Sequence, residues 1–284
     1  MRVLRTVDAV REFTRSHHRE GRTVGFVPTM GALHEGHLAL MGTAAQHADV
    51  VLASIFVNPT QFGPGEDLDA YPRDEQGDLD KAQAAGCQAV FMPSVEVMYP
   101  PGVATTVAVP DLAQYLCGQS RPTHFAGVCQ VVLKLFNIVG CDVAVFGQKD
   151  YQQLAIIRRM VRDLNVPVRV VGHPIVRASD GLALSSRNAY LSPHQRAQAL
   201  ALNQAVRAVG SAWARGLRDP VGLRAIALER LEAAEGARID YVEIADPDDL
   251  SPPQTPIRGG ILVALAVFFG QTRLIDNGVF LPAD

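Results

Sequence analysis

The sequence is poor in cysteine and has no long apolar run. It carries four cysteines in 284 residues, and none is spaced as C-x-x-C, so the sequence indicates neither a zinc knuckle nor a dithiol redox motif. No apolar stretch reaches the roughly 18 residues that a membrane-spanning helix needs. Arg2 and Arg5 interrupt the first residues, which lack the apolar core of a secretory signal peptide. We therefore expect a cytoplasmic protein with reduced thiols.

An excess of charge of either sign is also missing. The 26 basic and 29 acidic residues leave a net charge of −3, which gives no electrostatic reason to expect a nucleic acid or a membrane as partner. Apolar residues make up 48% of the chain, as is ordinary for a globular protein. The length suits one or two domains with a large core.

Strand-like and helix-like patterns alternate through the first part of the chain. The pattern predicts strands at residues 23–27, 50–57, 89–92, 105–109, 143–146 and 168–171, and helices at 38–46, 76–85, 125–139 and 151–164. The run at 50–57 is nearly all apolar, which fits a strand covered on both faces. Such alternation is typical of a doubly wound parallel sheet, so we predict a Rossmann-like α/β domain over residues 1–176.

The pattern changes in the remaining part of the chain. Ser192-Pro193 and Asp219-Pro220 each pair a capping residue with proline at the first helical position, which predicts helices to about residues 215 and 234. Strand-like runs follow at residues 239–244, 261–268 and 274–275. These elements predict a smaller α+β domain over residues 177–284.

The run PTMGALHEGH at residues 28–37 follows the first predicted strand and begins a helix. His34 and His37 fall on one face of its first turn, where helix amide groups attract anions. Gly31 and Gly36 allow a ligand close to the backbone. The run therefore suggests a nucleotide phosphate site, although a strand, a glycine turn and a helix also occur without function. The H-E-G-H spacing does not fit the H-E-x-x-H motif of zinc proteases.

Further polar residues follow other predicted strands or lie in a later loop. Gln61 lies just beyond one strand, and Lys149 and Asp150 lie beyond another; ligands of doubly wound sheets bind at such strand ends. Lys149 can reach phosphate oxygens, and the Ser185–Ser186–Arg187 run offers hydroxyl and guanidinium donors to a triphosphate. A capped turn and a polar surface loop are the plainer interpretations of these two segments.

Six motifs in this order resemble one family. They are PTMGALHEGH at 28–37, FVNPTQF at 56–62, YPRD at 71–74, HFAGV at 124–128, FGQKDYQQ at 146–153 and DGLALSSRN at 180–188. By these motifs the chain resembles the pantoate–β-alanine ligases, within the wider group of nucleotidylyl transferases that carry His-x-Gly-His. Leu184 departs from the methionine that we expect before Ser-Ser-Arg, a swap that roughly conserves volume.

The resemblance implies an enzyme that makes pantothenate, a coenzyme A precursor, from pantoate, β-alanine and ATP. Pantoate would first be adenylated with release of pyrophosphate, and the β-alanine amine would then displace AMP. The resemblance also implies magnesium with unassigned ligands, a homodimer, and a C-terminal domain that covers the ATP site.

Site residues are carried over from the family motif by motif. His37 would donate a proton, with His34, Lys149 and Arg187 as further catalytic residues. Gln61 would bind both pantoate and β-alanine, and Gln153 would bind pantoate. The residues that the resemblance assigns to ATP are Met30, Gly31, Ala32, Leu33, His34, Glu35, Gly36, His37, Gly147, Gln148, Lys149, Asp150, Val176, Leu184, Ser185, Ser186 and Arg187, with Asp150 on the ribose.

Two other functions stay open at this point. A nucleotidylyl transferase would stop at an adenylated product, and a nucleotide-binding protein with a decayed site would catalyse nothing. The intact His34, His37, Lys149 and Arg187 argue against decay. The segment 63–69, rich in glycine, proline and acids beside Gln61, is expected to act as a mobile gate.

Overall fold

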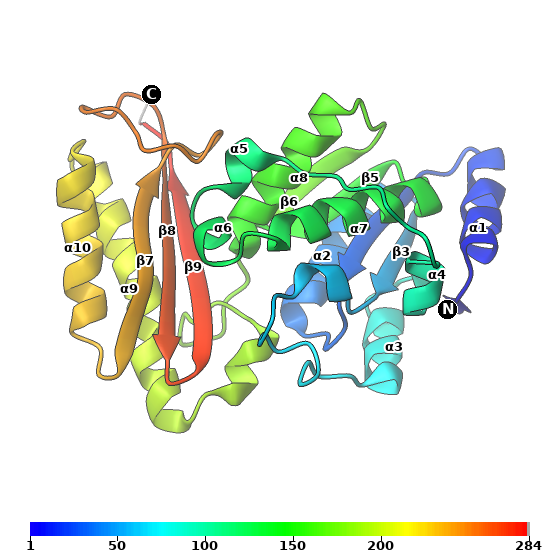
Figure 1. The fold of residues 1–284 in the computed structure, drawn as a ribbon, viewed down its shortest axis with the longest axis horizontal. Helices are drawn as coiled ribbons and strands as arrows, with labels where there is room; N and C mark the ends of the chain where they lie inside the picture. The colour runs from blue at the N-terminus through cyan, green and yellow to red at the C-terminus, as the bar shows by residue number, and fades with distance from the viewer. Residues whose placement is uncertain (283–284) are drawn as a thin grey trace. The chain divides into compact units, whose positions relative to one another are not determined.

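The computed structural model describes residues 1–282 and divides the chain into two compact units (Figure 1). Unit 1 comprises residues 1–113, 121–148 and 153–174. Unit 2 comprises residues 114–120, 149–152 and the described chain from Ile175 onward. Two short segments from the first part of the sequence therefore belong to the same body as the C-terminal region.

Unit 1 is built on a parallel sheet of six strands within the described chain, in the order β1-β4-β3-β2-β5-β6. The strands are β1 (Arg2–Leu4), β2 (Val24–Thr29), β3 (Val50–Ile55), β4 (Ala89–Phe91), β5 (Val143–Gly147) and β6 (Arg169–His173). The longer helices are α1 (Val7–Arg19), α2 (Glu35–His47), α3 (Glu75–Ala84), α7 (His124–Val139) and α8 (Tyr151–Asp163), and the shorter ones are α4 (Val95–Met98) and α5 (Pro110–Ala113).

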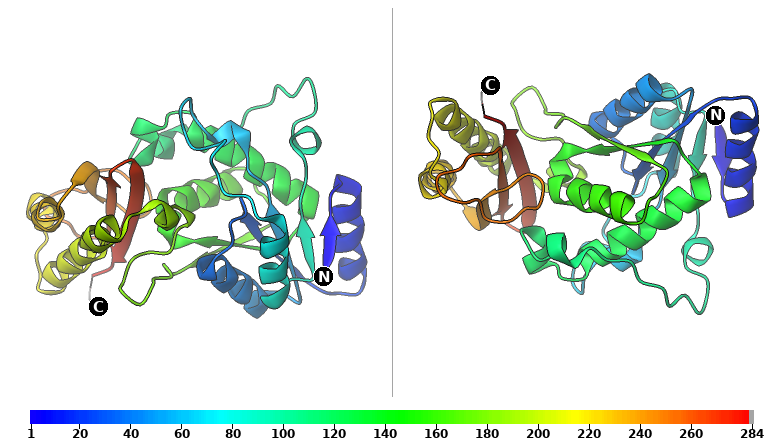
Figure 2. Two further views of the ribbon diagram at one scale, coloured as in Figure 1. Left: turned by 90° about the horizontal axis from the view of Figure 1, so that it is seen from below. Right: turned by 90° about the horizontal axis from the view of Figure 1, so that it is seen from above.

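Helices cover both faces of this sheet. Helices α2 and α3 lie on one face, and α1, α7 and α8 lie on the other (Figure 2). The covered strands are apolar on both sides: the neighbours Phe26 and Val27 in β2, and Val90 and Phe91 in β4, point to opposite faces and are all fully buried. The predicted doubly wound α/β fold is thus confirmed.

The N-terminal edge of this sheet differs from the prediction. The alternation did not predict β1 or α1, because β1 has only three residues and α1 is rich in charge. The strand predicted at residues 105–109 is wrong. The position beside β4 is taken by β1, and prolines at 100, 101 and 110 flank the segment, so it finds no neighbouring strand to bond with in the described chain.

Unit 2 contains an antiparallel sheet in the order β7-β8-β9, with two helices packed on one face. Its strands are β7 (Ala237–Ala245), β8 (Ile261–Phe269) and β9 (Thr272–Phe280), and its long helices are α9 (Pro193–Ala214) and α10 (Pro220–Glu232). Ser192 and Asp219 cap these helices as predicted. Strand β9 extends well beyond the predicted 274–275, because its polar residues Asp276 and Asn277 hide the strand pattern. The predicted α+β architecture is confirmed.

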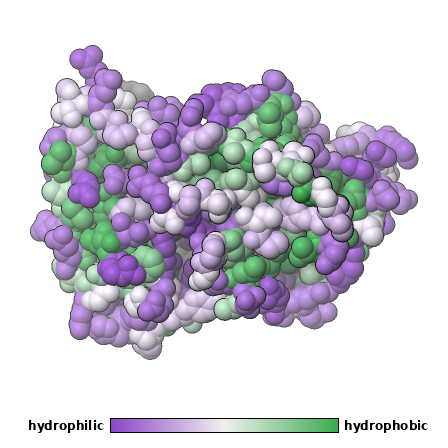
Figure 3. Space-filling view, in the orientation of Figure 1, coloured by the Kyte–Doolittle hydropathy of each residue, from purple (hydrophilic) through white to green (hydrophobic). Residues whose placement is uncertain are grey.

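The surface mixes hydrophilic and hydrophobic side chains over the face seen in Figure 3. Among the described helices, none combines the length and the apolar character that crossing a bilayer requires.

Candidate active site

The strand order of unit 1 places a topological switch point between β2 and β5. The chain leaves β2 towards β3 on one side and leaves β5 towards β6 on the other, while β2 and β5 are hydrogen-bonded neighbours. Crevices at the carboxyl ends of such a strand pair are where doubly wound sheets bind ligands. The residues that follow these two ends are the 30–37 turn after Thr29, and Gln148 after Gly147.

The two histidines of the 30–37 turn cap helix α2 reciprocally. His34 is the N-cap, and its Nδ1 accepts a hydrogen bond from the Gly36 amide at 3.1 Å. The His37 Nδ1 accepts from the His34 amide at 3.3 Å, and the two ring centroids are 4.2 Å apart. Because both Nδ1 atoms accept, each neutral ring carries its proton on Nε2. Both imidazoles therefore supply an Nε2–H donor from one helix start, a chemistry that suits phosphate oxygens.

A buried carboxylate holds the turn before these histidines. Asp78 of α3 is 1% exposed and accepts from the amides of Ala32 at 2.9 Å and Leu33 at 2.7 Å. Gly31 has φ +86°, and a Cβ there would lie 2.8 Å from Asp78 Oδ2, so only glycine fits. These amides, together with that of Gly36, already have acceptors. An anion here would rely on the imidazoles more than on the helix amides that the sequence suggested.

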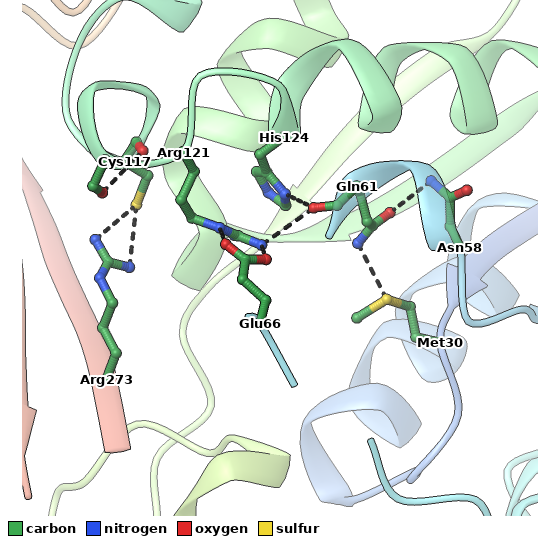
Figure 4. A network of polar contacts seen from close by, with 9 residues as sticks. Met30, Asn58, Gln61, Glu66, Cys117, Arg121, His124 and Arg273 are labelled. Atoms are coloured by element: carbon green, nitrogen blue, oxygen red, sulfur yellow. Dashed lines mark hydrogen bonds and ion pairs between the residues drawn. The ribbon is translucent and has the colours of Figure 1, made fainter. Parts of the chain in front are cut away.

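The turn after β3 places Gln61 in a buried amide network (Figure 4). Asn58 is 1% exposed, and its Nδ2 donates to Gln61 Oε1 at 3.1 Å and to the Gly127 carbonyl at 3.2 Å. Its Oδ1 accepts from the Tyr99 hydroxyl at 2.8 Å. The Gln61 Nε2 lies 3.1 Å from the Met30 sulfur. Gln61 is thus fixed next to the turn that follows β2, and the structure brings two of the predicted site segments together.

The backbone of Gln61 is held from the start of α7. Its carbonyl oxygen lies 2.7 Å from His124 Nδ1 and accepts from Arg121 Nη2 at 3.3 Å. Arg121 also forms a two-point ion pair with Glu66, with both nitrogen–oxygen distances at 2.6 Å. Burial opposes ionisation of Glu66, but pairing with Arg121 outweighs it and lowers the pKa of this carboxyl. Arg121 therefore connects Gln61 to the segment 63–69.

The other residue predicted to bind pantoate, Gln153, lies in the first turn of α8, the helix that follows β5. Its side chain is half-buried. Its neighbour Gln152 is buried instead and bonds the Tyr115 carbonyl at 2.7 Å and the Cys117 amide at 3.0 Å. The two adjacent glutamines thus differ: one is part of the interior, and the other remains partly accessible.

Other predicted residues belong to unit 2. Lys149 and Asp150 lie in the 3₁₀ turn η2 (Gln148–Asp150), with Lys149 Nζ 3.7 Å from Asp150 Oδ1. Ser185 caps a second 3₁₀ turn, η3 (Ser186–Tyr190), by accepting from the Arg187 amide at 3.3 Å. Val176 and Leu184 are joined by a backbone hydrogen bond of 2.9 Å. The structure thus joins Val176 to the segment that carries Ser185 and Arg187.

Residues 2–279 match the protein family described as pantoate-beta-alanine ligase. The chain belongs to this family. A relative named pantothenate synthetase from Moorella thermoacetica is 53% identical over 279 residues, which are 98% of each chain. The resemblance inferred from the six motifs is therefore confirmed over nearly the whole chain.

Solved structures of the family share the fold. A pantothenate synthetase from Thermus thermophilus superposes with a TM-score of 0.91 at 47% identity, covering 98% of both chains. A pantoate-beta-alanine ligase from Francisella tularensis, described as complexed with beta-gamma ATP and beta-alanine, gives a TM-score of 0.78 at 32% identity over 99% of this chain and 97% of its own.

Sequence reasoning missed several residues that hold the candidate site in place. Asp78 lies in the acidic stretch EQGDLDKAQA, where nothing distinguishes it from its exposed neighbours. In the sequence, Asn58 is only a polar residue just beyond a strand, and Glu66 is one acid of the 63–69 segment. A basic residue just before a helix, as Arg121 is, offered a weak signal at most. Their roles depend on contacts with distant segments, which no local pattern records.

The part of the chain that the structure describes contains no ready-made set of protein ligands for a metal ion. No group of three histidine, cysteine, aspartate or glutamate side chains lies close enough together there to hold a cation.

Proposed function

We propose that the chain catalyses the ATP-dependent condensation of pantoate with β-alanine to pantothenate, releasing AMP and pyrophosphate. The observation that carries the proposal is the histidine-capped helix at the switch point of a chain of this family. His34 and His37 share one helix start there, with Gln61 held close to the preceding turn by its contact with Met30. The Francisella relative described with ATP and β-alanine supports the same substrates.

In the first step, a pantoate carboxylate oxygen attacks the α-phosphorus of ATP. The new oxygen–phosphorus bond forms pantoyl adenylate as the bond to pyrophosphate breaks. Negative charge grows on the phosphoryl oxygens and on pyrophosphate, so hydrogen-bond donors are the main requirement. We assign this role to His34, His37, Lys149 and Arg187, with the Nε2–H of His37 donating a hydrogen bond to the phosphoryl oxygens.

In the second step, the β-alanine amine attacks the acyl carbon of the adenylate. The carbon–oxygen bond to AMP breaks, and the amine loses a proton. We assign Gln61 to both pantoate and β-alanine, because an amide both donates and accepts, and Gln153 to pantoate. The buried network around Asn58 suits this role, since it holds the Gln61 amide in one orientation.

We assign to the nucleotide the residues that the family motifs carry. They are Met30, Gly31, Ala32, Leu33, His34, Glu35, Gly36, His37, Gly147, Gln148, Lys149, Asp150 (on the ribose), Val176, Leu184, Ser185, Ser186 and Arg187. We propose residues 1–176 and 177–284 as the functional domains.

Magnesium would accompany ATP in this proposal. The residues described offer no three-ligand protein cage, so the ion would be held chiefly by phosphate oxygens and water, as is usual for magnesium. No step above depends on it. We also propose that the enzyme is a cytoplasmic homodimer.

Incubation of the purified chain with ATP, pantoate and β-alanine tests the function. We expect AMP and pantothenate in equal amounts, and no AMP without pantoate. The nucleotidylyl transferase alternative would be favoured by a different result. In that case ATP and pantoate, without β-alanine, would give continuous pyrophosphate release and a free adenylate that later addition of β-alanine does not consume. Nucleotide binding without any turnover would favour a decayed site.

A further inference from the structure

Two neighbouring polar residues are buried on strand β9 of unit 2. Asp276 is 2% exposed and Asn277 is 6% exposed, and the other buried residues of the strand are Thr272 and Leu274. Burying a carboxylate and an amide is costly unless each finds hydrogen-bond partners. Both do, and their partners lie in two different segments of unit 2.

Asn277 holds the backbone of Lys149. Its Nδ2 donates to the Lys149 carbonyl oxygen at 2.8 Å. The turn η2 that contains Lys149 is only three residues long, so a fixed carbonyl restricts where the lysine side chain can begin. A buried hydrogen bond of this kind fixes the backbone without touching the ammonium group itself.

Asp276 holds a second segment through Arg177. Its two carboxylate oxygens accept from Arg177 Nη1 at 2.7 Å and Nη2 at 2.8 Å, a two-point ion pair. Arg177 Nη1 also donates to the Gly181 carbonyl at 3.1 Å. The guanidinium therefore ties β9 to the tight hairpin that runs from Val176 to Leu184.

This hairpin leads directly into the Ser185–Arg187 run. Arg177 and Ala183 form an antiparallel bridge, and the Leu184 amide donates to the Val176 carbonyl at 2.9 Å. Beyond it, Asn188 Nδ2 donates to the Ala183 carbonyl at 3.0 Å. The backbone that carries Ser185 and Arg187 is thus anchored at both ends to the hairpin that Asp276 holds.

We propose that Asp276 and Asn277 are positioning residues for ATP: one strand fixes both unit 2 segments that bind the nucleotide. The inference rests on the proposed function, because Lys149 and Arg187 are assigned to ATP there. The two anchors are themselves coupled, since Asp276 Oδ1 also accepts from the Asn277 amide at 2.8 Å. β9 thereby sets the relative position of the two basic side chains, although it presents neither of them itself.

The test compares Asn277→Asp and Asn277→Ala with the unaltered chain. Asn277→Asp keeps the shape but removes the Nδ2 donor, and Asn277→Ala removes the amide without adding charge. We expect KM for ATP to rise about tenfold in both, the effect of losing one buried hydrogen bond. KM for β-alanine should stay unchanged. Asp276→Asn should raise KM for ATP as well, with a larger loss of thermal stability.

Asp240→Asn is the matched control. Asp240 forms an ion pair with Arg273 on the same sheet at 2.7 Å, away from the two anchoring contacts of β9. Its substitution should lower the unfolding midpoint without changing KM for ATP. A purely structural role of Asn277 would be revealed by equal increases in KM for all three substrates.

Two results separate the possible failures. If the unaltered chain forms no AMP with pantoate, the proposed function is wrong, and this inference falls with it. If the unaltered chain is active, and both Asn277 variants fold and keep its KM for ATP, only the inference is overturned.

Discussion

Two adjacent stretches of unit 1 are held in opposite ways. The turn Asn58–Gln61 is anchored by buried amide bonds, with Asn58 at 1% and Gln61 at 9% exposure. The segment 63–69 that follows contains no buried residue, and the partly exposed Glu66–Arg121 ion pair links it to the rest of unit 1. The two stretches differ in their access to water. Breaking a buried hydrogen bond leaves its partners without water to bond to, whereas the partners of an accessible ion pair can bond to water instead.

The contrast suggests a division of roles. The proposed recognition of pantoate and β-alanine by Gln61 needs an amide in one orientation, and the buried turn supplies it. A gate needs an opening free energy that is small enough for turnover, and an accessible ion pair suits that need. Since Arg121 contacts both the Gln61 carbonyl and Glu66, it is the point where the fixed stretch meets the proposed gate.

The test with the largest expected effect removes His37, a proposed catalytic residue close to the buried Asn58–Gln61 turn. His37→Ala should slow AMP formation by roughly 10²–10³-fold, the usual loss when one hydrogen-bond donor to the developing charge is removed. The same change removes the cap bond from the His34 amide, so the unfolding midpoint must be measured alongside the rate. His47→Ala, at the exposed end of the same helix, is the control. Near-normal turnover in the His37 variant would remove this histidine from the catalytic role.

The next test breaks the fixed turn by steric pressure. A Cβ on Gly127 would lie 2.3 Å from the Thr60 carbonyl oxygen and 2.8 Å from Gln61 Cα. Gly127→Ala should therefore destabilise the fold by about 1–3 kcal/mol and raise KM for pantoate, because backbone must shift. Gly42→Ala has open space around it and should be neutral or stabilising. Chemical denaturation and pantoate kinetics measure both; a Gly127 variant as stable and active as the unaltered chain would show that the turn yields easily.

A third test weakens the hydrogen bonds by which Asp78 holds the turn before His34. In the Asp78→Asn variant one of the two side-chain oxygens becomes an NH₂ group, so the side chain can no longer accept from the Ala32 and Leu33 amides with a separate oxygen for each. We expect the free energy of unfolding to fall by about 1–3 kcal/mol. KM for ATP should rise as the 30–33 turn relaxes. Asp80→Asn, on the exposed side of the same helix, should change neither quantity. Equal effects of the two substitutions would mean that the buried carboxylate does not hold the turn.

The mildest test concerns the proposed gate. Glu66→Gln should change global stability by less than about 1 kcal/mol, because the pair is partly exposed. Hydrogen exchange of residues 63–69 should nevertheless become faster, while residues 58–61 stay protected. Glu75→Gln, which breaks an exposed ion pair with Arg5 elsewhere in unit 1, is the control and should leave both stretches unchanged.

The pKa of Glu66 adds a pH dependence to this test. Since folding lowers the pKa below its ordinary value of 4.5, the stabilising contribution is fully present above that value and is lost as the pH falls below it. At a pH below this range, the hydrogen exchange of residues 63–69 in the unaltered chain should be as fast as in the Glu66→Gln variant, after correction for the intrinsic exchange rate. If the difference between the two persists unchanged in acid, the ion pair does not control opening.

The architecture was largely predictable from the sequence because the relevant signals are local. Apolar runs such as 50–57 and capped starts such as Ser192-Pro193 and Asp219-Pro220 are each written in a few neighbouring residues. The strand predicted at 105–109 failed for the opposite reason. A strand needs a neighbour, and β1 had already taken the place beside β4.

By itself, the sequence determined the fold class, the family, and which side chains could meet phosphates and amides, since these follow from periodicity, motif order and side-chain chemistry. Only the tertiary structure decided what holds those side chains in place. Asp78, Asn58, Arg121 and Asn277 bond to backbone or side chains up to 128 residues away. Hydrogen bonds form between groups that folding brings within about 3 Å, and no local pattern encodes such meetings.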